Sequence, residues 1–239
     1  MNVPSTGLVV VAAGVGSRLG GAVHKALVTL EGRPLVEHTL RRLLAVPWLD
    51  PVVCVGHADD RQALGELLAD MPRAVDHVDG GARRQDSVAA GLAALDNRCE
   101  VVFVHDAARP FVPLDALEPL RASAASHGCA LLAVPVADTL KAVPETDTPS
   151  DRQVERTVPR AGLWAAQTPQ AFRTQDLSQA LQIAAQEGRT VTDEAALFEA
   201  AGRGVRIVEG SRVNFKITTA EDLALARALL ATEGKGGEP

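Results

Sequence analysis

The first residues that could do chemistry follow an apolar segment near the N-terminus. In the stretch VVVAAGVGSRLGGAVHK, residues 9–25, Gly14 and Gly16 come directly after the apolar run, and Arg18 and Lys25 follow them. A glycine-rich turn lets the backbone approach a phosphate, whose oxygens its N–H groups can bind. Two additional cations suit a triphosphate, or a transition state in which charge builds up around phosphorus. The stretch therefore predicts a phosphate-binding loop.

Two familiar phosphate-binding patterns do not fit this loop. The dinucleotide pattern Gly-x-Gly-x-x-Gly needs a third glycine where the chain has Leu19, and no Gly-Lys-Ser/Thr follows to make a Walker loop. The next apolar segment ends in Val55-Gly56-His57, without the acidic residue that binds a ribose in dehydrogenases. A dehydrogenase is therefore disfavoured. A tight strand-to-helix turn with solvated cations remains the structural alternative.

A second glycine turn, DGGARRQDS at residues 79–87, follows another short apolar segment. Gly80 and Gly81 carry no side chain, so the backbone there can approach a flat ligand such as a nucleobase. Ser87 lies at or near the start of a predicted helix, where it is either an N-cap or a ligand contact. Both interpretations of Ser87 stay open.

A third group, VFVHDAARP at residues 102–110, ends an apolar strand on His105 and Asp106. A carboxylate at the carboxyl end of a strand could bind a metal ion or a substrate hydroxyl, and the small alanines after it leave room. Arg109 could pair with Asp106 or with a phosphate, and a purely structural salt bridge is the alternative. His105 has no evident catalytic partner, which favours a structural role.

The second half of the chain adds further cations and polar side chains. Arg160 precedes the polar run QTPQ, and Lys216 lies between apolar neighbours before the last predicted helix. Thr192 comes directly before an Asp-Glu pair typical of the first turn of a helix. Together, two glycine turns, several cations and one strand-end carboxylate suit a nucleoside triphosphate and a second phosphorylated substrate.

Composition limits the class of protein more than it identifies it. Of 239 residues 46% are hydrophobic, enough for a sizeable core, yet no apolar run approaches the ~18 residues of a membrane helix. We see no secretory signal, and three widely spaced cysteines indicate buried reduced thiols, so we expect a cytoplasmic protein that does not bind membranes. A net charge of −6 argues against nucleic acid as a partner.

The elements that position these residues alternate along the chain. Apolar runs predict strands over residues 7–13, 50–55, 74–78, 101–105, 129–134 and 205–209. Amphipathic patterns predict helices over residues 35–45, 59–70, 87–95, 114–127, 177–187, 193–201 and 220–230. This alternation predicts an α/β fold, with a mostly parallel, Rossmann-like sheet flanked by helices on both faces. Ligands bind such sheets at the carboxyl ends of the strands, where the groups above fall.

One segment interrupts the alternation. Residues 137–161 contain two strand-like pieces, 139–143 and 153–158, around a polar loop with two prolines. We expect a hairpin arm that leaves the sheet. A lone hairpin is marginally stable in water, so the arm must pack on something, and we expect a second subunit. We predict one domain over residues 1–232, including this arm, and a disordered tail at 233–239.

These motifs, in this order, resemble the nucleotidyltransferases that join a nucleoside triphosphate to a sugar or polyol phosphate. The resemblance runs from Val9 to about Leu230 and is most specific in AAGVGSRLG, GGARRQDSV, VHDAARP, DTLK, LWAAQTPQAF, TDEA and NFKIT. Within that family it is nearest to the cytidylyltransferases of the non-mevalonate isoprenoid pathway. It implies that CTP and a methylerythritol phosphate give a CDP-alcohol and pyrophosphate.

The resemblance also implies roles for individual residues. The catalytic cations are Arg18, Lys25, Arg160 and Lys216, of which the last two also match acceptor-phosphate positions. The nucleotide-binding residues are Ala12, Ala13, Gly14, Gly16, Gly81, Ala82 and Ser87. The acceptor-binding residues are Asp106, Arg109, Thr139, Thr168 and Thr192. A divalent cofactor, Mg²⁺ or another ion, is held mainly by the triphosphate, with Asp106 as a candidate ligand. The chain departs from the family at His24 and Ala26, which flank Lys25 in place of proline and glutamine.

Two alternatives stay open beside this assignment. A cytidylyltransferase acting on ribitol 5-phosphate shares the fold and overlapping motifs, although VHDAARP and TDEA favour the methylerythritol phosphate. A non-catalytic nucleotide-binding regulator is more distant, because every candidate cation is retained. In the homodimer that we expect, the arm carries Thr139 and Arg160 to the partner's active site, so each site is shared.

Overall fold

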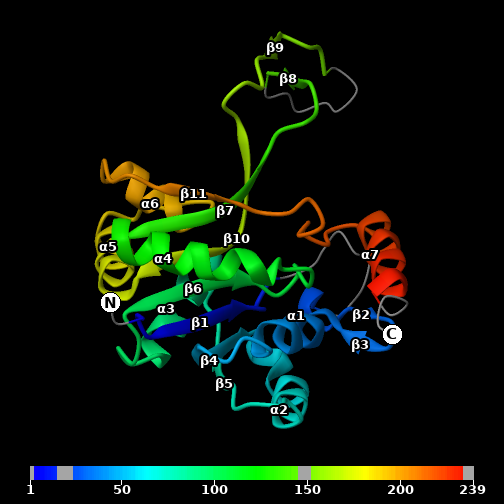
Figure 1. The fold of residues 1–239 in the computed structure, drawn as a ribbon, viewed down its shortest axis with the longest axis vertical. Coiled ribbons are helices and arrows are strands. Elements are labelled where there is room, and N and C mark those ends of the chain that lie inside the picture. The colour runs from blue at the N-terminus through cyan, green and yellow to red at the C-terminus, as the bar shows by residue number, and fades with distance from the viewer. Residues whose placement is uncertain (1–2, 15–23, 145–151, 234–239) are drawn as a thin grey trace.

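A seven-stranded sheet forms the centre of the molecule (Figure 1). The computed structural model describes residues 3–14, 24–144 and 152–233. The sheet order is β11-β7-β10-β6-β1-β4-β5. Its strands are β1 (Thr6–Val11), β4 (Leu49–Gly56), β5 (Asp76–Asp79), β6 (Val101–Asp106), β7 (Cys129–Pro135), β10 (Trp164–Arg173) and β11 (Arg206–Glu209). All neighbours are parallel except β10, which is antiparallel to both β6 and β7.

Helices cover both faces of this sheet, as the sequence predicts. The α-helices are α1 (Leu35–Leu44), α2 (Arg61–Ala69), α3 (Arg84–Ala94), α4 (Leu117–His127), α5 (Thr174–Gln186), α6 (Ala195–Ala200) and α7 (Ala220–Glu233). Short 3₁₀ turns are η2 (Lys25–Leu27), η3 (Ala58–Asp60) and η4 (Leu114–Ala116). Along β1, Leu8 and Val10 pack with α1, α2 and α4, whereas Val9 packs with α3, α5 and α6. Burial on both faces explains why β1, β4 and β6 are almost uninterrupted apolar runs.

A smaller apolar cluster lies beside the main sheet. The two-stranded pair β2 (Thr29–Leu30) and β3 (Arg33–Pro34) packs near α7 through Leu30, Ile217 and Ala226. This cluster fixes the segment before α7, which carries Lys216. No helix in the described part of the chain is long and apolar enough to cross a membrane.

The sequence-based prediction misses one strand of the sheet. β10 lies in the centre, between β6 and β7, and its sequence WAAQTPQAFR was not predicted as a strand. A proline cannot donate a ladder hydrogen bond and argues against a central strand. The structure accommodates Pro169 at a register irregularity between Ala166 and Gln170, where the pairing with β7 is interrupted. The other predicted strands are confirmed, with ends that shift by a few residues.

The predicted hairpin arm is present. β8 (Leu140–Ala142) pairs antiparallel with β9 (Arg156–Val158), and this two-stranded sheet stands well away from the central one (Figure 1). The polar loop at residues 145–151 lies outside the described residues, as do Gly16, Arg18 and the tail at 234–239. Val143 and Val154 are exposed on the arm of the single chain.

The three cysteines are free and buried, as the sequence predicts. Burial raises the pKa of Cys54 to about 12, so its thiol stays protonated at neutral pH.

Close approach of α3 to the sheet generates a stability prediction. A Cβ added at Gly91 would lie 2.5 Å from Val9 Cγ1 and 2.7 Å from Val55 Cγ2. Both valines are in central strands that cannot easily move aside. Overpacking of this kind typically costs about 1–3 kcal/mol, so Gly91→Ala is expected to lower the free energy of unfolding. Gly65→Ala in α2, where nothing lies within 4 Å, should raise it by about 0.5–1 kcal/mol. Urea unfolding of both variants checks the contrast, and equal effects would contradict it.

Candidate active site

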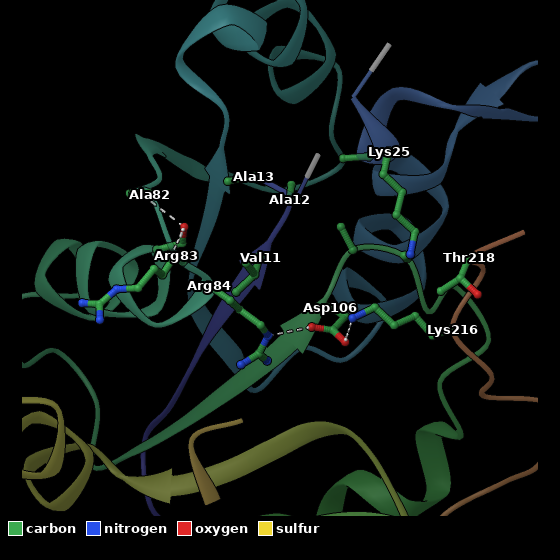
Figure 2. A pocket seen from close by; sticks show the side chains of 16 residues that line it. Val11, Ala12, Ala13, Lys25, Ala82, Arg83, Arg84, Asp106, Lys216 and Thr218 are labelled. Atoms are coloured by element: carbon green, nitrogen blue, oxygen red, sulfur yellow. Dashed lines mark hydrogen bonds and ion pairs between the residues drawn. The ribbon is translucent and has the colours of Figure 1, made fainter. Parts of the chain in front are cut away.

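A pocket opens at the carboxyl ends of β1 and β6, beside the N-terminus of α3 (Figure 2). The described residues that line it are Val11, Ala12, Ala13, Gly14, Lys25, Ala26, Gly81, Ala82, Arg83, Arg84, Ser87, Asp106, Ala107, Ala108, Lys216 and Thr218. One wall consists of small residues and backbone, and the opposite wall carries cations around Asp106. The pocket thus offers a close-packed surface and a charged surface to one ligand.

The small-residue wall depends on glycine. Gly80 N–H donates to Gly56 O at 2.7 Å, and Ala12 N–H donates to Val55 O at 2.7 Å, so both turns are anchored to β4. A Cβ on Gly80 would lie 2.6 Å from Ala13 Cβ, so the second turn packs against the first only because residue 80 is glycine. Gly80 therefore lies directly beside Ala13, the residue before Gly14, whereas Gly16 is outside the described residues.

Ser87 is not the N-cap of α3. The helix begins at Arg84, three residues earlier than predicted, because the Asp86 carboxylate accepts from Arg83 N–H at 3.1 Å. Ser87 lies inside the first turn with Oγ donating to Arg83 O at 3.2 Å and accepting from Gly81 N–H at 3.2 Å. Its hydroxyl therefore ties the glycine turn to the helix at the edge of the pocket.

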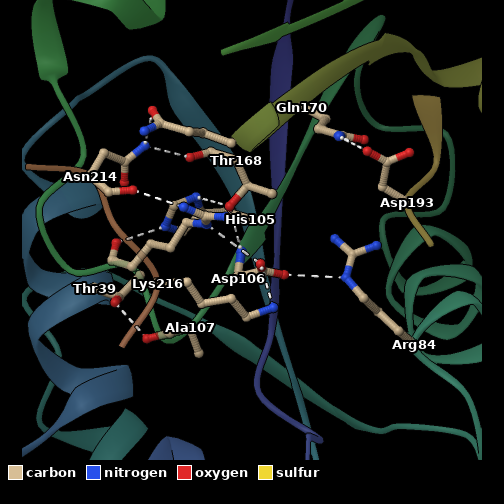
Figure 3. A network of polar contacts seen from close by, with 12 residues as sticks. Thr39, Arg84, His105, Asp106, Ala107, Thr168, Gln170, Asp193, Asn214 and Lys216 are labelled. Atoms are coloured by element: carbon tan, nitrogen blue, oxygen red, sulfur yellow. Dashed lines mark hydrogen bonds and ion pairs between the residues drawn. The ribbon is translucent and has the colours of Figure 1, made fainter. Parts of the chain in front are cut away.

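Asp106 is the centre of the charged wall (Figure 3). It ends β6 with a side chain only 9% exposed, and Arg84 Nε lies 3.2 Å from its Oδ1. Lys216 Nζ lies 2.9 Å and Arg109 Nε 3.6 Å from Oδ2. Burial alone would raise the pKa of Asp106, but Arg84, Lys216 and Arg109 hold it well below the ordinary value. The carboxylate is therefore ionised throughout the neutral range.

Arg84 bridges two carboxylates that are far apart in the sequence. Its guanidinium also pairs with Glu194, whose side chain is 1% exposed just before α6. Burial raises the pKa of Glu194, an effect that the ion pair with Arg84 opposes. The sequence showed Arg84 beside Asp86 in one motif and Glu194 in another, but it gave no signal that the two residues meet.

Hydrogen bonds with the uncharged residues Thr168 and His105 also hold Asp106 in place. Asp106 N–H donates to Thr168 Oγ1 at 3.1 Å, and Thr168 Oγ1 lies 3.0 Å from His105 Nδ1. His105 Nε2 must carry a proton, because its partner at 3.0 Å is the Arg109 carbonyl. Thr168 therefore donates to Nδ1 and accepts from the amide. Burial lowers the pKa of His105 to about 4, so the ring is neutral and structural, as predicted.

Asn214 holds the segment that presents Lys216. Its side chain is fully buried and donates to Thr168 O at 2.9 Å and to Gln167 Oε1 at 3.2 Å. The backbone carbonyl of Asn214 accepts from Arg109 Nη1 at 2.8 Å, and Ile217 N–H donates to Ala108 O at 2.9 Å. Lys216 is thus fixed by backbone contacts on both sides.

The structure brings most of the predicted site residues together, but not all of them. Ala12, Ala13, Gly14, Lys25, Gly81, Ala82, Ser87, Asp106 and Lys216 line the pocket, and Arg109 and Thr168 support Asp106. Thr139 and Arg160 lie on the arm and Thr192 on the loop before α6, and none of the three lines the pocket of its own chain. Arg84, Glu194 and Asn214 are site residues that sequence reasoning missed.

The fold and the site together define a class. A glycine turn at a helix N-terminus and a cationic wall at the carboxyl ends of parallel strands are the features of a nucleotide-binding α/β protein that handles phosphates. The chain belongs to the 2-C-methyl-D-erythritol 4-phosphate cytidylyltransferase family, whose model matches residues 6–232.

Relatives and solved structures agree with this membership. A 2-C-methyl-D-erythritol 4-phosphate cytidylyltransferase of Chromobacterium violaceum is 46% identical, with 92% of this chain and 95% of that protein covered. The chain spans 57% of the bifunctional enzyme IspD/IspF of Rhodospirillum rubrum, to which it is 43% identical over 95% of its own length. The solved structure of 4-diphosphocytidyl-2C-methyl-D-erythritol synthase from Anaerococcus prevotii has a TM-score of 0.83 at 28% identity, covering 96% of this chain and all of that one.

The charged cluster predicts a pH-dependent stability. Because cations lower the pKa of Asp106 in the folded chain, its stabilising effect is complete above the ordinary value of 3.8 and is lost as the pH falls below it. Asp106→Asn removes the carboxylate from buried cations, which should cost about 3–5 kcal/mol at pH 7. In urea unfolding, the difference in the free energy of unfolding between the variant and the unmodified protein should become smaller below pH 4. Asp115→Asn, an exposed change in η4, is the control, and a pH-independent difference would contradict the assignment.

Proposed function

We propose that this chain transfers the cytidylyl group of CTP to 2-C-methyl-D-erythritol 4-phosphate. The products are 4-diphosphocytidyl-2-C-methyl-D-erythritol and pyrophosphate. Family membership supports the reaction, and the observation that carries it is the two-sided pocket, with a small-residue wall facing cations around Asp106. The free, buried cysteines support a reducing compartment, and we place the reaction in the cytoplasm.

The small-residue wall is the proposed cytosine site. Ala12, Ala13, Gly81 and Ala82 line the pocket with little side-chain volume, so their backbone groups can reach the edge of a base. Ser87 closes this side, because its hydroxyl and Gly81 N–H are already joined. A pyrimidine fits such a close-packed edge better than the larger purine, which supports CTP as the nucleotide.

The cationic wall is the proposed site of the reaction. An oxygen of the acceptor phosphate attacks the α-phosphorus of CTP, forming a new P–O bond while the bond to the β-phosphate breaks and pyrophosphate leaves. The nucleophile is already anionic at neutral pH, so no general base is needed, and the neutral, buried His105 is not one. Positioning can contribute ~7–11 kcal/mol, and fixed cations several more. Lys25 and Lys216 line the pocket and are proposed to stabilise the phosphate charge that develops in the reaction. Arg18 is assigned to the same role from the sequence alone.

The residues of the pocket fit a Mg²⁺ ion that is held mainly by substrate. Mg²⁺ commonly binds through one or two carboxylates together with substrate phosphates. Asp106 is the carboxylate among the described lining residues, and cations already contact both of its oxygens. It can therefore supply only a small part of a coordination shell. When bound, the ion would neutralise phosphate charge, and Asp106 is also placed to accept hydrogen bonds from acceptor hydroxyls.

We further propose that the protein acts as a homodimer with shared sites. The arm stands away from the central sheet (Figure 1). Its Val143 and Val154 are exposed in the single chain. Thr139 and Arg160 are exposed at its base and do not line the pocket of their own chain. If the arm packs on a partner, both residues can reach the partner's pocket and bind the acceptor phosphate there.

The function itself is tested by pyrophosphate release. With Mg²⁺ and CTP, the protein should release pyrophosphate when 2-C-methyl-D-erythritol 4-phosphate is added, and much less with ribitol 5-phosphate. Replacing CTP by ATP should lower kcat/KM strongly, because the small-residue wall excludes a purine. Preference for ribitol 5-phosphate would identify the sibling activity. Comparable kcat/KM for ATP would overturn the cytosine site.

The shared site is tested by complementation. Lys25→Ala should lower kcat by two or more orders of magnitude, since one lost donor in such a site is worth roughly 2.7–4 kcal/mol. Arg160→Ala should raise KM for the polyol phosphate far more than KM for CTP. At a polyol phosphate concentration too low for Arg160→Ala to turn over, mixing the two variants should restore part of the activity, because one site of the heterodimer is intact. A fully active monomer, or no recovery after demonstrated subunit exchange, would leave the arm a local flap.

A further inference from the structure

Two histidines stack at the edge of the sheet, just outside the pocket. His24 directly precedes Lys25, and His57 directly follows β4. Their ring centroids lie 4.1 Å apart with a tilt of 33° between the planes. Asp59, in η3, completes the group, and one ligand atom from each of the three residues lies within 4.8 Å of the others. The reaction proposed above uses none of these three side chains.

The hydrogen bonds of the two rings indicate which nitrogen of each carries the lone pair. His24 Nδ1 donates to Asp60 Oδ2 at 2.7 Å, so in the neutral ring Nε2 keeps its lone pair. His57 Nδ1 accepts from Asp59 N–H at 3.2 Å, so this nitrogen is the unprotonated one. Neutral imidazole nitrogens are the form that binds transition metals. Metal binding at His57 Nδ1 would replace the bond from the Asp59 amide.

The spacing of the ligand atoms is suitable for one ion. His57 Nδ1 and Asp59 Oδ2 lie 3.4 Å apart. Bonds of ~2.0–2.2 Å from zinc to nitrogen and oxygen in a tetrahedral arrangement place two ligands about 3.4 Å apart. The contact between Asp60 and His24 is the carboxylate–histidine arrangement that orients ligating imidazoles in metal sites. Both rings are partly exposed, so water can reach the group as a further ligand.

We propose that His24, His57 and Asp59 form a site for a transition-metal ion of the Zn²⁺ type, with water as a further ligand. Imidazole nitrogen suits zinc, cobalt and nickel, whereas Mg²⁺ prefers oxygen ligands, so this site is distinct from the ion of the reaction. Two neighbouring cations, Arg61 and Lys25, direct their charged groups away from the proposed site. Arg61 pairs with Asp79, and the Lys25 side chain points into the pocket (Figure 2).

An ion at this place would join two walls of the pocket. His24 is the residue before η2, the turn that presents Lys25, and Leu27 N–H donates to its carbonyl at 2.9 Å. His57 continues β4, whose Val55 and Gly56 carbonyls anchor the two glycine turns. Binding would therefore fix the segment that carries Lys25 against the strand that carries the nucleotide wall.

The test uses the full chain after chelator treatment, without nucleotide or phosphate. Co²⁺ should bind one equivalent and give the visible absorption of a four-coordinate ion, and Zn²⁺ should displace it. His24→Gln and His57→Gln should each weaken binding about tenfold or more, and Asp60→Asn by about 10–100-fold. His127→Gln on α4, whose ring contacts Ser123 O in its own helix, is the matched control and should bind normally.

Stability provides the second readout. Because a ligand that binds only the folded chain stabilises it, saturating Zn²⁺ should raise Tm of the unmodified protein and of His127→Gln but not of His57→Gln. Thermal melting in the absence of metal checks that the variants fold. If a histidine variant does not fold, Asp59→Asn, which changes an exposed ligand, is used in its place. The proposal is overturned if Co²⁺ shows no saturable binding, or if His24→Gln and His57→Gln bind as tightly as the unmodified protein.

Discussion

The site depends on one buried carboxylate. A charge removed from water is costly unless it is paired, so Asp106 at the end of β6 requires cations, and it obtains them from three places in the chain. Arg84 comes from the start of α3, Arg109 from the turn after β6, and Lys216 from the segment before α7. Neutralising a single group therefore gathers segments that the sheet alone would not hold together.

The same cluster sets the charge of the pocket. Among the described residues, Arg84, Arg109 and Lys216 surround Asp106 and Glu194, so the cations outnumber the carboxylates. Lys25 also lines the pocket. A protein with a net charge of −6 can in this way present a locally positive surface to a polyanion. Beneath it, Thr168 and the neutral His105 hold Asp106 in place without adding charge. Position and electrostatics are thus supplied by different residues.

Sequence reasoning predicted the parts of this arrangement that depend on local patterns. Apolar runs in β1, β4 and β6 gave the parallel core. Residues at the carboxyl ends of the strands lie at one edge as expected, among them Ala12 after β1, Gly81 after β5 and Asp106 at the end of β6. β10 was not predicted, because Pro169 and two glutamines interrupt its apolar pattern. In the folded chain its hydrogen bonds to β6 and β7 stabilise it as a strand.

Long-range pairing was also invisible to sequence reasoning. Glu194 is explained locally as an acid in the first turn of a helix, and Arg84 lies in the glycine motif ahead of the helix predicted from residue 87. Only the folded chain shows that both are shielded and that one neutralises the other. Asn214 begins the quoted motif NFKIT but received no role there, since an asparagine in a loop usually faces water, whereas here it is fully buried.

The arm has a topological property that follows from the pairing of β7 with β10. The arm leaves the sheet after Pro135 and returns at Trp164, two residues that face each other across the ladder, and Val136 N–H donates to Leu163 O at 3.1 Å. The whole excursion is therefore an insertion whose two ends are neighbours, and its removal would leave a gap that a short turn can close. The strand that returns from the arm continues into Thr168 and the floor of the site. The length and surface of the arm can thus change in evolution while the pairing of β7, β10 and β6 beneath it stays the same.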